Sequence, residues 1–209
     1  MKKVFSLLTF VFLVFTVRAS FTVIPGVIRN VTSEFILEYL DMQYPETDFT
    51  DFIYVRIKKQ KLLHFKDGKL FKVYDVSTGR NGVGCEAGSG KTPTGLHYVK
   101  GKYGTSVPFG GILKSKRFTG HFADIINEPI SSNSDDITTR VLTLSGKEEG
   151  HNKGGTCDSY QRRIYIHGTP EEGLIGQPVS HGCVRMRNSD VIELFDNVDV
   201  KTPVILLNN

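Results

Sequence analysis

The sequence predicts a mainly β domain with a few short helices, and three observations support this fold class. Residues 61–66 and 69–79 alternate side chains with period two on either side of Asp67-Gly68, a pair typical of a tight hairpin turn. Further short runs of strand character follow, separated by glycine-rich loops. Helical spacing of apolar residues is confined to short segments. The other strand candidates are residues 52–59, 96–100, 137–144, 162–167 and 204–207.

Two short helices are expected, one on each side of the strand-rich region. Residues 33–42 have apolar side chains at helical spacing, and the segment stops before Pro45. Residues 188–198 have the same spacing, and Asn188 or Ser189 is the expected N-cap. The apolar face of this second helix consists of Val191, Ile192, Leu194 and Phe195.

The first residues predict an export signal. Met1-Lys2-Lys3 is a basic start, and Val4–Val17 is a mostly apolar run. This run is too short for a comfortable membrane span, which needs about 20 residues. Val17 and Ala19 are the small residues of a cleavage site, so we expect cleavage after Ala19, with retention as an uncleaved anchor as the alternative. The expected location is therefore the periplasm or the cell wall, with no stable membrane span after cleavage.

Composition and charge describe a globular chain with little basic character of its own. The 209 residues have a net charge of +4, and loss of Lys2, Lys3 and Arg18 with the signal would leave +1. No basic tract remains, so we expect no nucleic-acid partner. The expected organisation is a signal at 1–19, a short helical segment at 20–49 and one main domain at 50–209.

Two long irregular stretches interrupt the strand pattern, at residues 79–95 and 101–136. Loops of this length in a compact domain are usually functional. We expect both to form walls of a substrate cleft.

The chain has three cysteines, Cys85, Cys157 and Cys183, so at least one thiol is free. A free thiol in an oxidising compartment is a liability unless it is used. In the simplest arrangement Cys183 is free and reactive. Cys85 and Cys157 are then either paired or individually buried, and the sequence leaves both alternatives open.

Residues 164–186 contain the densest cluster of reactive side chains. His167 ends a strand candidate, and His181-Gly182-Cys183 are consecutive. A thiolate paired with an imidazolium attacks carbonyl groups well, so Cys183 with one of the two histidines is a candidate catalytic pair. The backbone N–H groups of Gly182 and Cys183 could stabilise an oxyanion, and Arg185 could bind a substrate carboxylate. The simpler alternative is a buried structural cysteine and a hydrogen-bonded structural histidine.

Metal and nucleotide binding are weaker interpretations of the same residues. Ligand types are present, but no CxxC, HExxH or HxxxH spacing occurs, so we expect no metal. CEAGSGKT at residues 85–92 resembles a phosphate-binding loop, yet Cys85 stands where that pattern requires glycine. The potential ligands are His151, Cys157, His167, His181 and Cys183.

Four motifs together resemble the L,D-transpeptidase catalytic domain, also called the YkuD domain. These are His167-Gly168, SHGCVRM at 180–186, VSTGR at 76–80 and KTPTG at 91–95. The resemblance covers roughly residues 50–207. It implies a mostly β sandwich or open barrel with a few short helices and with the cysteine in a cleft. Residues 118–160 do not follow the family pattern, and we expect an insertion that covers the cleft.

The resemblance also implies roles for individual residues. Cys183 would be the acylated nucleophile, His167 its base, and the carbonyl of Gly168 would orient the imidazole. The thiolate would attack the bond between a diamino acid and a terminal D-amino acid in a peptidoglycan stem, without a metal or organic cofactor. An acceptor amine would then resolve the thioester, in the service of cell-wall biogenesis and cell shape. The remaining expected site residues are His181 and Gly182 as supporting groups, and Ser180 and Arg185 as substrate-binding groups.

Two alternatives stay open beside a transpeptidase. An L,D-carboxypeptidase would use the same nucleophile but admit water in place of the acceptor amine. A wall-binding module would keep the fold without the chemistry. Neither the acceptor nor the oligomeric state follows from the sequence.

Overall fold

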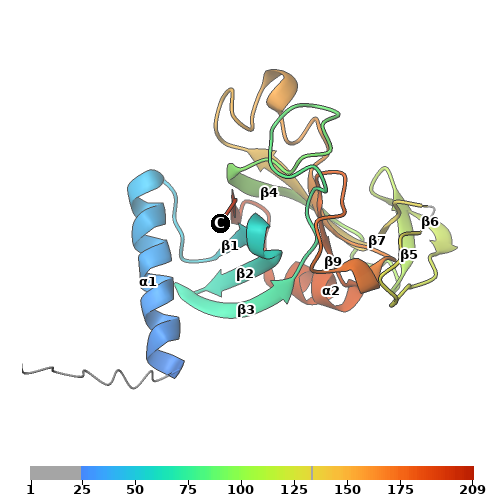
Figure 1. Ribbon diagram of the computed structural model, residues 1–209, viewed down its shortest axis with the longest axis horizontal. Coiled ribbons are helices and arrows are strands. Elements are labelled where there is room, and N and C mark those ends of the chain that lie inside the picture. The colour runs from blue at the N-terminus through green and yellow to red at the C-terminus, as the bar shows by residue number, and fades with distance from the viewer. Residues whose placement is uncertain (1–24, 133) are drawn as a thin grey trace, which may run out of the picture.

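The computed structural model describes residues 25–132 and 134–209 (Figure 1). The export signal expected at residues 1–19, its cleavage after Ala19 and the alternative of a retained anchor lie outside these residues. In the part of the chain that is described, no helix is both long enough and apolar enough to cross a membrane. Two α-helices are present in that part, α1 (Pro25–Gln43) and α2 (Asn188–Asn197).

The strands form one mixed, branched sheet of ten strands in the order β3-β2-β1-β10-β4-β7-β5-β6. A branch leaves this path at β7, which also pairs with β8, and β8 pairs with β9. Pairing is antiparallel except between β1 and β10 and between β8 and β9. The strands are β1 (Phe52–Arg56), β2 (Lys61–Lys66), β3 (Lys69–Asp75), β4 (Gly95–Tyr103), β5 (Gly111–Lys114), β6 (Arg117–Phe122), β7 (Ile137–Gly146), β8 (Tyr165–Gly168), β9 (Val184–Met186) and β10 (Pro203–Leu207). Short 3-10 turns occur at Ile57–Lys59, Gly155–Cys157 and Glu172–Leu174.

The predicted mainly β class and the Asp67-Gly68 hairpin are confirmed. β2 and β3 pair antiparallel across this turn. Asp67 and Gly68 have φ values of 49° and 66°, so both turn residues are left-handed, as a two-residue hairpin turn that follows the strand twist requires. Strands also form at each of the other predicted runs, with limits that differ by a few residues.

The sheet is covered on both faces, because alternate residues of its central strands enter different cores. Ile53 and Val55 of β1 join the main core with α2, whereas Phe52 and Tyr54 face a second core on the α1 side. Val191, Leu194 and Phe195 supply the buried face of α2. The apolar face expected for this helix is therefore confirmed, with Ile192 at its half-buried edge.

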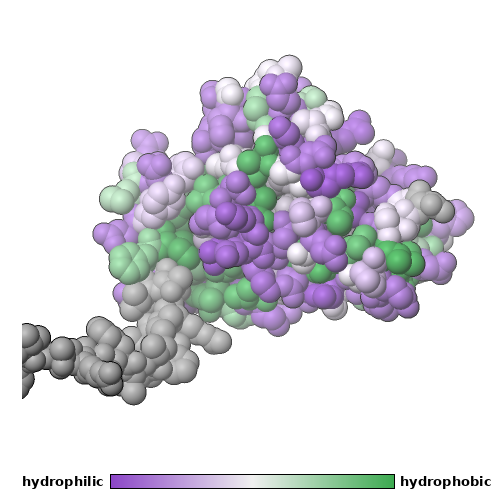
Figure 2. Space-filling model, in the orientation of Figure 1, coloured by the Kyte–Doolittle hydropathy of each residue, from purple (hydrophilic) through white to green (hydrophobic). Residues whose placement is uncertain are grey.

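Figure 1 places α1 at one end of the molecule and the β5–β6 hairpin at the other. Figure 2 shows a mostly hydrophilic surface with apolar areas near both of these ends. Phe35, Tyr39 and Met42 are exposed on α1, and Phe118 and Phe122 are exposed on the hairpin. The central region between the ends carries the motifs expected to form the site.

Two local expectations are wrong. Residues 101–136 are not irregular throughout, because they contain the end of β4 and the β5–β6 hairpin. Most side chains of β6 are exposed, so the hairpin lacks the alternation of a half-buried strand.

The expected N-cap of α2 is the second difference. Arg187 occupies this position, and the Asn188 side chain bonds to Thr138, Thr139, Thr169 and Glu172. The carboxylate of Glu172 accepts the N–H of Asn188 instead.

Candidate active site

The parallel pair β8–β9 brings the two ends of the cysteine–histidine motif together. His167 lies opposite Arg185, and Ile166 lies opposite Val184. Cys183 immediately precedes β9, so its thiol lies beside the start of β8. The 15 residues between these strands, 169–183, provide the crossover that parallel pairing needs.

The thiol of Cys183 contacts two backbone groups that precede or begin β8. The Sγ atom lies 3.3 Å from the carbonyl oxygen of Arg163, and the N–H of Tyr165 points to Sγ with an N···S distance of 3.4 Å. Arg163 has a φ of 59°, a left-handed conformation that is uncommon in residues with a Cβ. Among the described residues, no hydrogen bond joins the thiol to an imidazole.

His167 is held by the backbone of the next residue. Its Nδ1 lies 2.8 Å from the carbonyl oxygen of Gly168. A carbonyl can only accept, so this contact assigns the proton to Nδ1 and leaves the lone pair on Nε2. This is the orientation that the resemblance implies for Gly168.

Burial sets the protonation states of both groups. Burial lowers the pKa of His167 to about 4, and the hydrogen bond to Gly168 opposes this shift only in part. Burial also raises the pKa of Cys183 to about 11, against the stabilising N–H of Tyr165. With these pKa values the thiol and the imidazole are both neutral at neutral pH, so the thiol has to lose its proton as it reacts with a substrate.

His181 does not face the thiol but forms an exposed pair with a carboxylate. Its Nδ1 lies 2.5 Å from Oδ2 of Asp135. The other oxygen of Asp135 accepts a hydrogen bond from the guanidinium of Arg185. One carboxylate therefore connects His181 to Arg185.

Arg185 is buried, with 3% of its side chain exposed, and carboxylates already occupy both of its terminal nitrogens. Its Nη1 lies 2.5 Å from Oε2 of Glu171, which is equally buried. Carboxylates of the chain itself thus engage both terminal nitrogens of Arg185, the expected substrate-binding group. These contacts position the start of β9.

Glu171 also anchors part of the long loop before β7. It accepts hydrogen bonds from the hydroxyls of Ser131 and Ser132 at 2.9 Å and 3.0 Å, and from the N–H of Ser132. Burial alone would raise the pKa of Glu171, but these bonds and Arg185 outweigh it and lower the pKa. Glu171 and Asp135 were not singled out in the sequence, since neither lies in a recognisable motif.

Ser180 and Gly182 shape the turn that carries Cys183. The Ser180 hydroxyl is buried, donates to the Cys183 carbonyl at 2.6 Å and accepts the Gly182 N–H at 3.1 Å. Ser180 is therefore unavailable as the substrate-binding group expected, and Gly182 N–H is not a free oxyanion donor. Among the described residues, no hydrogen bond occupies the Cys183 N–H, so this donor remains for an oxyanion.

Gly182 is required by its backbone conformation and its close approach to another loop. Its φ is 118°, and a Cβ at this position would lie 2.7 Å from the carbonyl oxygen of Lys91. Any other residue would collide with this backbone atom.

The two supporting motifs hold the cysteine turn directly. Thr92 of KTPTG donates through Oγ1 to the Gly182 carbonyl at 3.0 Å and accepts the Gly79 N–H at 2.8 Å. Ser77 exchanges two backbone hydrogen bonds with Arg185. These short motifs are therefore structural supports of the cysteine loop.

Cys85 and Cys157 form a disulfide, with Cα atoms 4.5 Å apart. Of the two arrangements that the sequence left open, the paired one is present, and Cys183 is the free cysteine. The bond joins loop 79–95 to the segment before β8. Arg162 reinforces the same junction, because its guanidinium donates to the carbonyls of Gly84 and Lys91.

A cavity of about 480 Å³ opens beside the thiol. Arg163 and Tyr165 line it, and these are the residues whose backbone contacts Sγ. Lys116 lies on its rim, with Nζ 5.1 Å and 5.2 Å from the ring centroids of Tyr103 and Tyr160. Lys116 belongs to the β5–β6 turn, so this hairpin borders the cavity. Tyr160, at the end of region 118–160, also lines it.

The potential metal ligands are dispersed. In the described residues, no group of three or more His, Cys, Asp or Glu side chains could hold a metal ion. His151 is exposed and its Nε2 lies 3.1 Å from the hydroxyl of Thr94. His121 is exposed on β6.

This geometry defines a mainly β domain in which a free cysteine directly precedes β9 and a carbonyl-oriented histidine lies on the neighbouring strand β8. The L,D-transpeptidase catalytic domain (YkuD) family matches residues 50–206. The chain belongs to this family.

Curated relatives match over a short part of the chain. The putative L,D-transpeptidase YqjB of Bacillus subtilis is 46% identical over 48 residues, which are 22% of this chain and 27% of that protein. The probable L,D-transpeptidase ErfK/SrfK of Escherichia coli is 47% identical over 58 residues, which are 27% of this chain and 19% of that protein. The matched region is thus about a quarter or less of these relatives' length.

Solved structures match over more of the chain at low identity. An L,D-transpeptidase from Mycobacterium smegmatis is 17% identical with a TM-score of 0.46, covering 76% of this chain and 58% of its own. The structure of the Ldtfm-avibactam carbamoyl enzyme is 21% identical with a TM-score of 0.48, covering 77% of this chain and 49% of its own.

Proposed function

We propose that this domain is a cysteine-dependent L,D-transpeptidase that acts on peptidoglycan stem peptides. The observation that carries the proposal is the parallel β8–β9 pair, which places Cys183 beside the start of β8 and His167 opposite Arg185, near a cavity of about 480 Å³ that Arg163 and Tyr165 line. The hydrogen bond from Nδ1 of His167 to Gly168 supports Nε2 as the base. Cys183, His167 and Gly168 thus retain the roles that the family resemblance implies.

In the acylation step, Nε2 of His167 takes the thiol proton as Sγ attacks the carbonyl carbon of the donor stem. The tetrahedral oxyanion accepts the N–H of Cys183. Collapse forms the thioester and breaks the bond to the terminal D-amino acid, whose amine takes the proton from His167. No metal or organic cofactor is needed for these steps.

In the second step, an amine from another stem attacks the thioester and His167 takes its proton. The new amide bond crosslinks the two stems, and the thiolate recovers its proton from His167. Water in place of the amine would give the carboxypeptidase alternative. Ser180, Gly182, His181 and Arg185 serve this proposal as positioning residues of the cysteine turn and β9.

The proposed setting is outside the cytoplasm, in the periplasm or at the cell wall, after cleavage of residues 1–19. The Cys85–Cys157 disulfide supports this setting, because disulfides persist in oxidising compartments. The proposed catalytic unit is residues 50–209, with 20–49 as a helical addition. Nucleic acid is not a proposed partner.

The test is to incubate residues 20–209, beside a Cys183→Ala control, with tetrapeptide muropeptides and to analyse the products by mass spectrometry. Dimers joined through third-position residues would support a transpeptidase. Tripeptides with free D-alanine would make it a carboxypeptidase. If products do not depend on Cys183, the proposal is wrong and the wall-binding module becomes the better account.

A further inference from the structure

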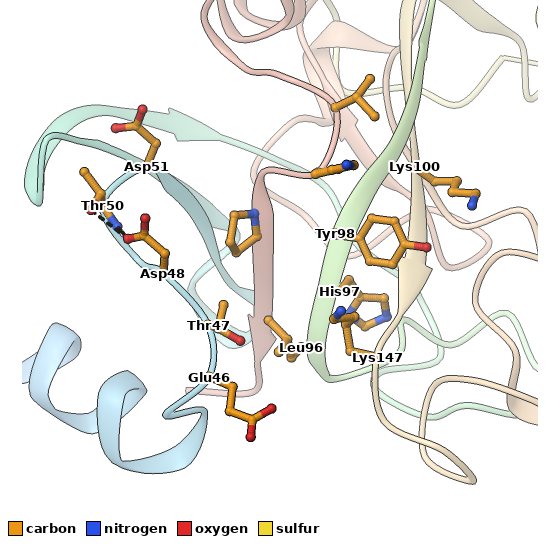
Figure 3. A pocket seen from close by; sticks show the side chains of 13 residues that line it. Glu46, Thr47, Asp48, Thr50, Asp51, Leu96, His97, Tyr98, Lys100 and Lys147 are labelled. Carbon is orange, nitrogen blue, oxygen red and sulfur yellow. Dashed lines mark hydrogen bonds between the residues drawn. The ribbon is translucent and has the colours of Figure 1, made fainter.

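A cavity of about 750 Å³ has neither Cys183 nor His167 in its lining. It is a groove between the 46–51 segment that follows α1 and the strands β4 and β10 (Figure 3). None of its lining residues contacts Cys183 or His167 by a hydrogen bond. The proposed chemistry therefore leaves this groove without a role.

The two walls of the groove carry opposite charges. Figure 3 shows Glu46, Asp48 and Asp51 along one wall and Lys100 and Lys147 along the other. Lys201 adds a third cation to the lining, and the apolar floor includes Leu96, Val200 and Pro203.

These charges do not neutralise each other across the groove. In residues 25–132 and 134–209, no ion pair involves any of the three acids or the three lysines. Opposite charges on the two sides of an open groove leave attractive potential on both sides. A ligand with one cationic and one anionic end could satisfy both walls at once.

Local contacts fix each wall in place. On the acidic side, Oδ1 of Asp48 accepts the N–H and the hydroxyl of Thr50, and Oδ1 of Asp51 accepts the N–H of Asp67. Each carboxylate keeps its second oxygen free of these bonds. The acidic wall is thus held before any ligand arrives, which lowers the entropic cost of binding.

On the basic side, Tyr98 stands between two ammonium groups. Nζ of Lys147 lies 5.5 Å and Nζ of Lys100 lies 5.9 Å from the centroid of its ring. A hydrogen bond with Ser145 lowers the pKa of Tyr98, and the two lysines lower it further. The positive charge of Lys100 and Lys147 therefore already affects the ionisation of Tyr98.

We propose that this groove is a second binding site, separate from Cys183, for a short peptide that carries both a free ammonium group and a free carboxylate. The carboxylate would lie on the lysine side of the groove, beside Tyr98, and the ammonium would face Glu46 and Asp48. A stem peptide that ends in a diamino acid has both groups. This choice of peptide rests on the proposed function, whereas the charge complementarity does not.

The test is a titration of the Cys183→Ala chain with the tripeptide L-alanyl-γ-D-glutamyl-meso-diaminopimelate, followed by NMR. Shifts of Tyr98 and its neighbours that saturate are expected. Two analogues separate the charges: a peptide acetylated at both of its amines keeps only carboxylates, and a peptide amidated at all three of its carboxylates keeps only ammonium groups. Each analogue should bind at least about threefold more weakly, the upper range of an exposed charge contact.

Variants of each wall complete the design. Lys100→Gln with Lys147→Gln should weaken binding about tenfold, and Glu46→Gln about threefold. Lys58→Gln, an exposed lysine outside the groove, should leave the affinity unchanged. Equal affinity of the tripeptide and its analogues, shifts confined to the surroundings of residue 183, or no shifts at millimolar peptide would each overturn the proposal. Because the chain used lacks the thiol, none of these outcomes depends on whether the wild type is a transpeptidase.

Discussion

The two sides of the cavity beside Cys183 are built in different ways. One side, here called the floor, has Arg163 and Tyr165 at the cavity and is backed by β8 and residues 180–186, where internal hydrogen bonds engage His167, Ser180, Gly182 and Arg185. The other side, the exposed rim, is the β5–β6 hairpin, whose β6 strand is largely exposed. The floor fixes the geometry of the reacting atoms, whereas the rim is free to contact a substrate. Substitutions on the floor should therefore affect chemistry or stability, and substitutions on the rim should affect binding.

The largest effect should follow loss of the floor histidine. We expect His167→Ala to slow acylation of Cys183 by a carbapenem about 10²–10⁴-fold, because the general base is removed. Intact-mass spectrometry over time measures the rate. His181→Ala should slow it far less, since His181 bonds to Asp135 and not to the thiol.

His151→Ala is the matched control for this comparison, because that histidine is exposed and bonds only to Thr94. It should react at the wild-type rate. A greater loss in His181→Ala than in His167→Ala would mean that the base has been assigned to the wrong imidazole.

The buried ion pair of the floor should be the next most sensitive feature. Glu171→Gln leaves the buried Arg185 guanidinium without one of its carboxylates, and we expect a loss of about 3 kcal/mol in the free energy of unfolding. Urea denaturation measures this change. Glu149→Gln breaks an exposed pair with Lys153 and should change the unfolding curve little.

Equal destabilisation by these two substitutions would contradict the burial of the ion pair between Glu171 and Arg185. It would mean that Arg185 is better solvated than its 3% exposure indicates.

The thiol itself offers a pH test of the floor. Burial raises the pKa of Cys183 to about 11, so its thiolate should be about a hundredfold scarcer at neutral pH than that of an ordinary cysteine. The rate of iodoacetamide alkylation should keep rising with pH beyond 9. Mass spectrometry of the modified chain, with N-acetylcysteine as the reference thiol, measures it.

The acid side of the same test concerns His167, whose pKa burial lowers to about 4. Carbapenem acylation should therefore persist below pH 6.5 and fall only as pH approaches 4. Suppose instead that acylation falls near pH 6.5 and that thiol alkylation levels off near pH 8.5. Water would then reach both groups, and burial would not shift their pKa values.

The smallest effect should come from the rim. Lys116 lies over Tyr103 and Tyr160 without a carboxylate partner among the described residues. We expect Lys116→Gln to raise KM for a muropeptide donor about threefold and to leave kcat unchanged, because an exposed charge contact contributes little and acts on binding. Lys114→Gln on the same hairpin, outside the cavity lining, is the control.

The sequence predicted the floor better than the rim, for physical reasons. The hairpin turn, the strands and the cysteine motif depend on short-range patterns or on motifs with strict backbone requirements, such as Gly182. The β5–β6 hairpin has no regular apolar alternation, so the sequence pattern does not predict its strands. Glu171 and Asp135 act through partners 14 and 50 residues away, a distance that local patterns do not encode.

The internal hydrogen bonds of Ser180 and Arg185 could not be predicted from the sequence for a related reason. A hydroxyl and a guanidinium next to a nucleophile suit substrate binding as well as they suit internal support. Their burial decides between the two, and burial depends on how β8, β9 and loop 79–95 come together. Likewise, burial lowers the pKa of His167, and the sequence alone does not predict how deeply a histidine is buried.

The disulfide has a consequence for how active protein is obtained. Three cysteines allow three single-disulfide isomers, and only the Cys85–Cys157 isomer leaves the nucleophile free. The two mispaired isomers would consume Cys183 and misplace loop 79–95. Oxidation that outpaces folding would therefore yield inactive chains of correct mass, so the specific activity of a preparation should depend on whether thiol–disulfide exchange was allowed to proceed.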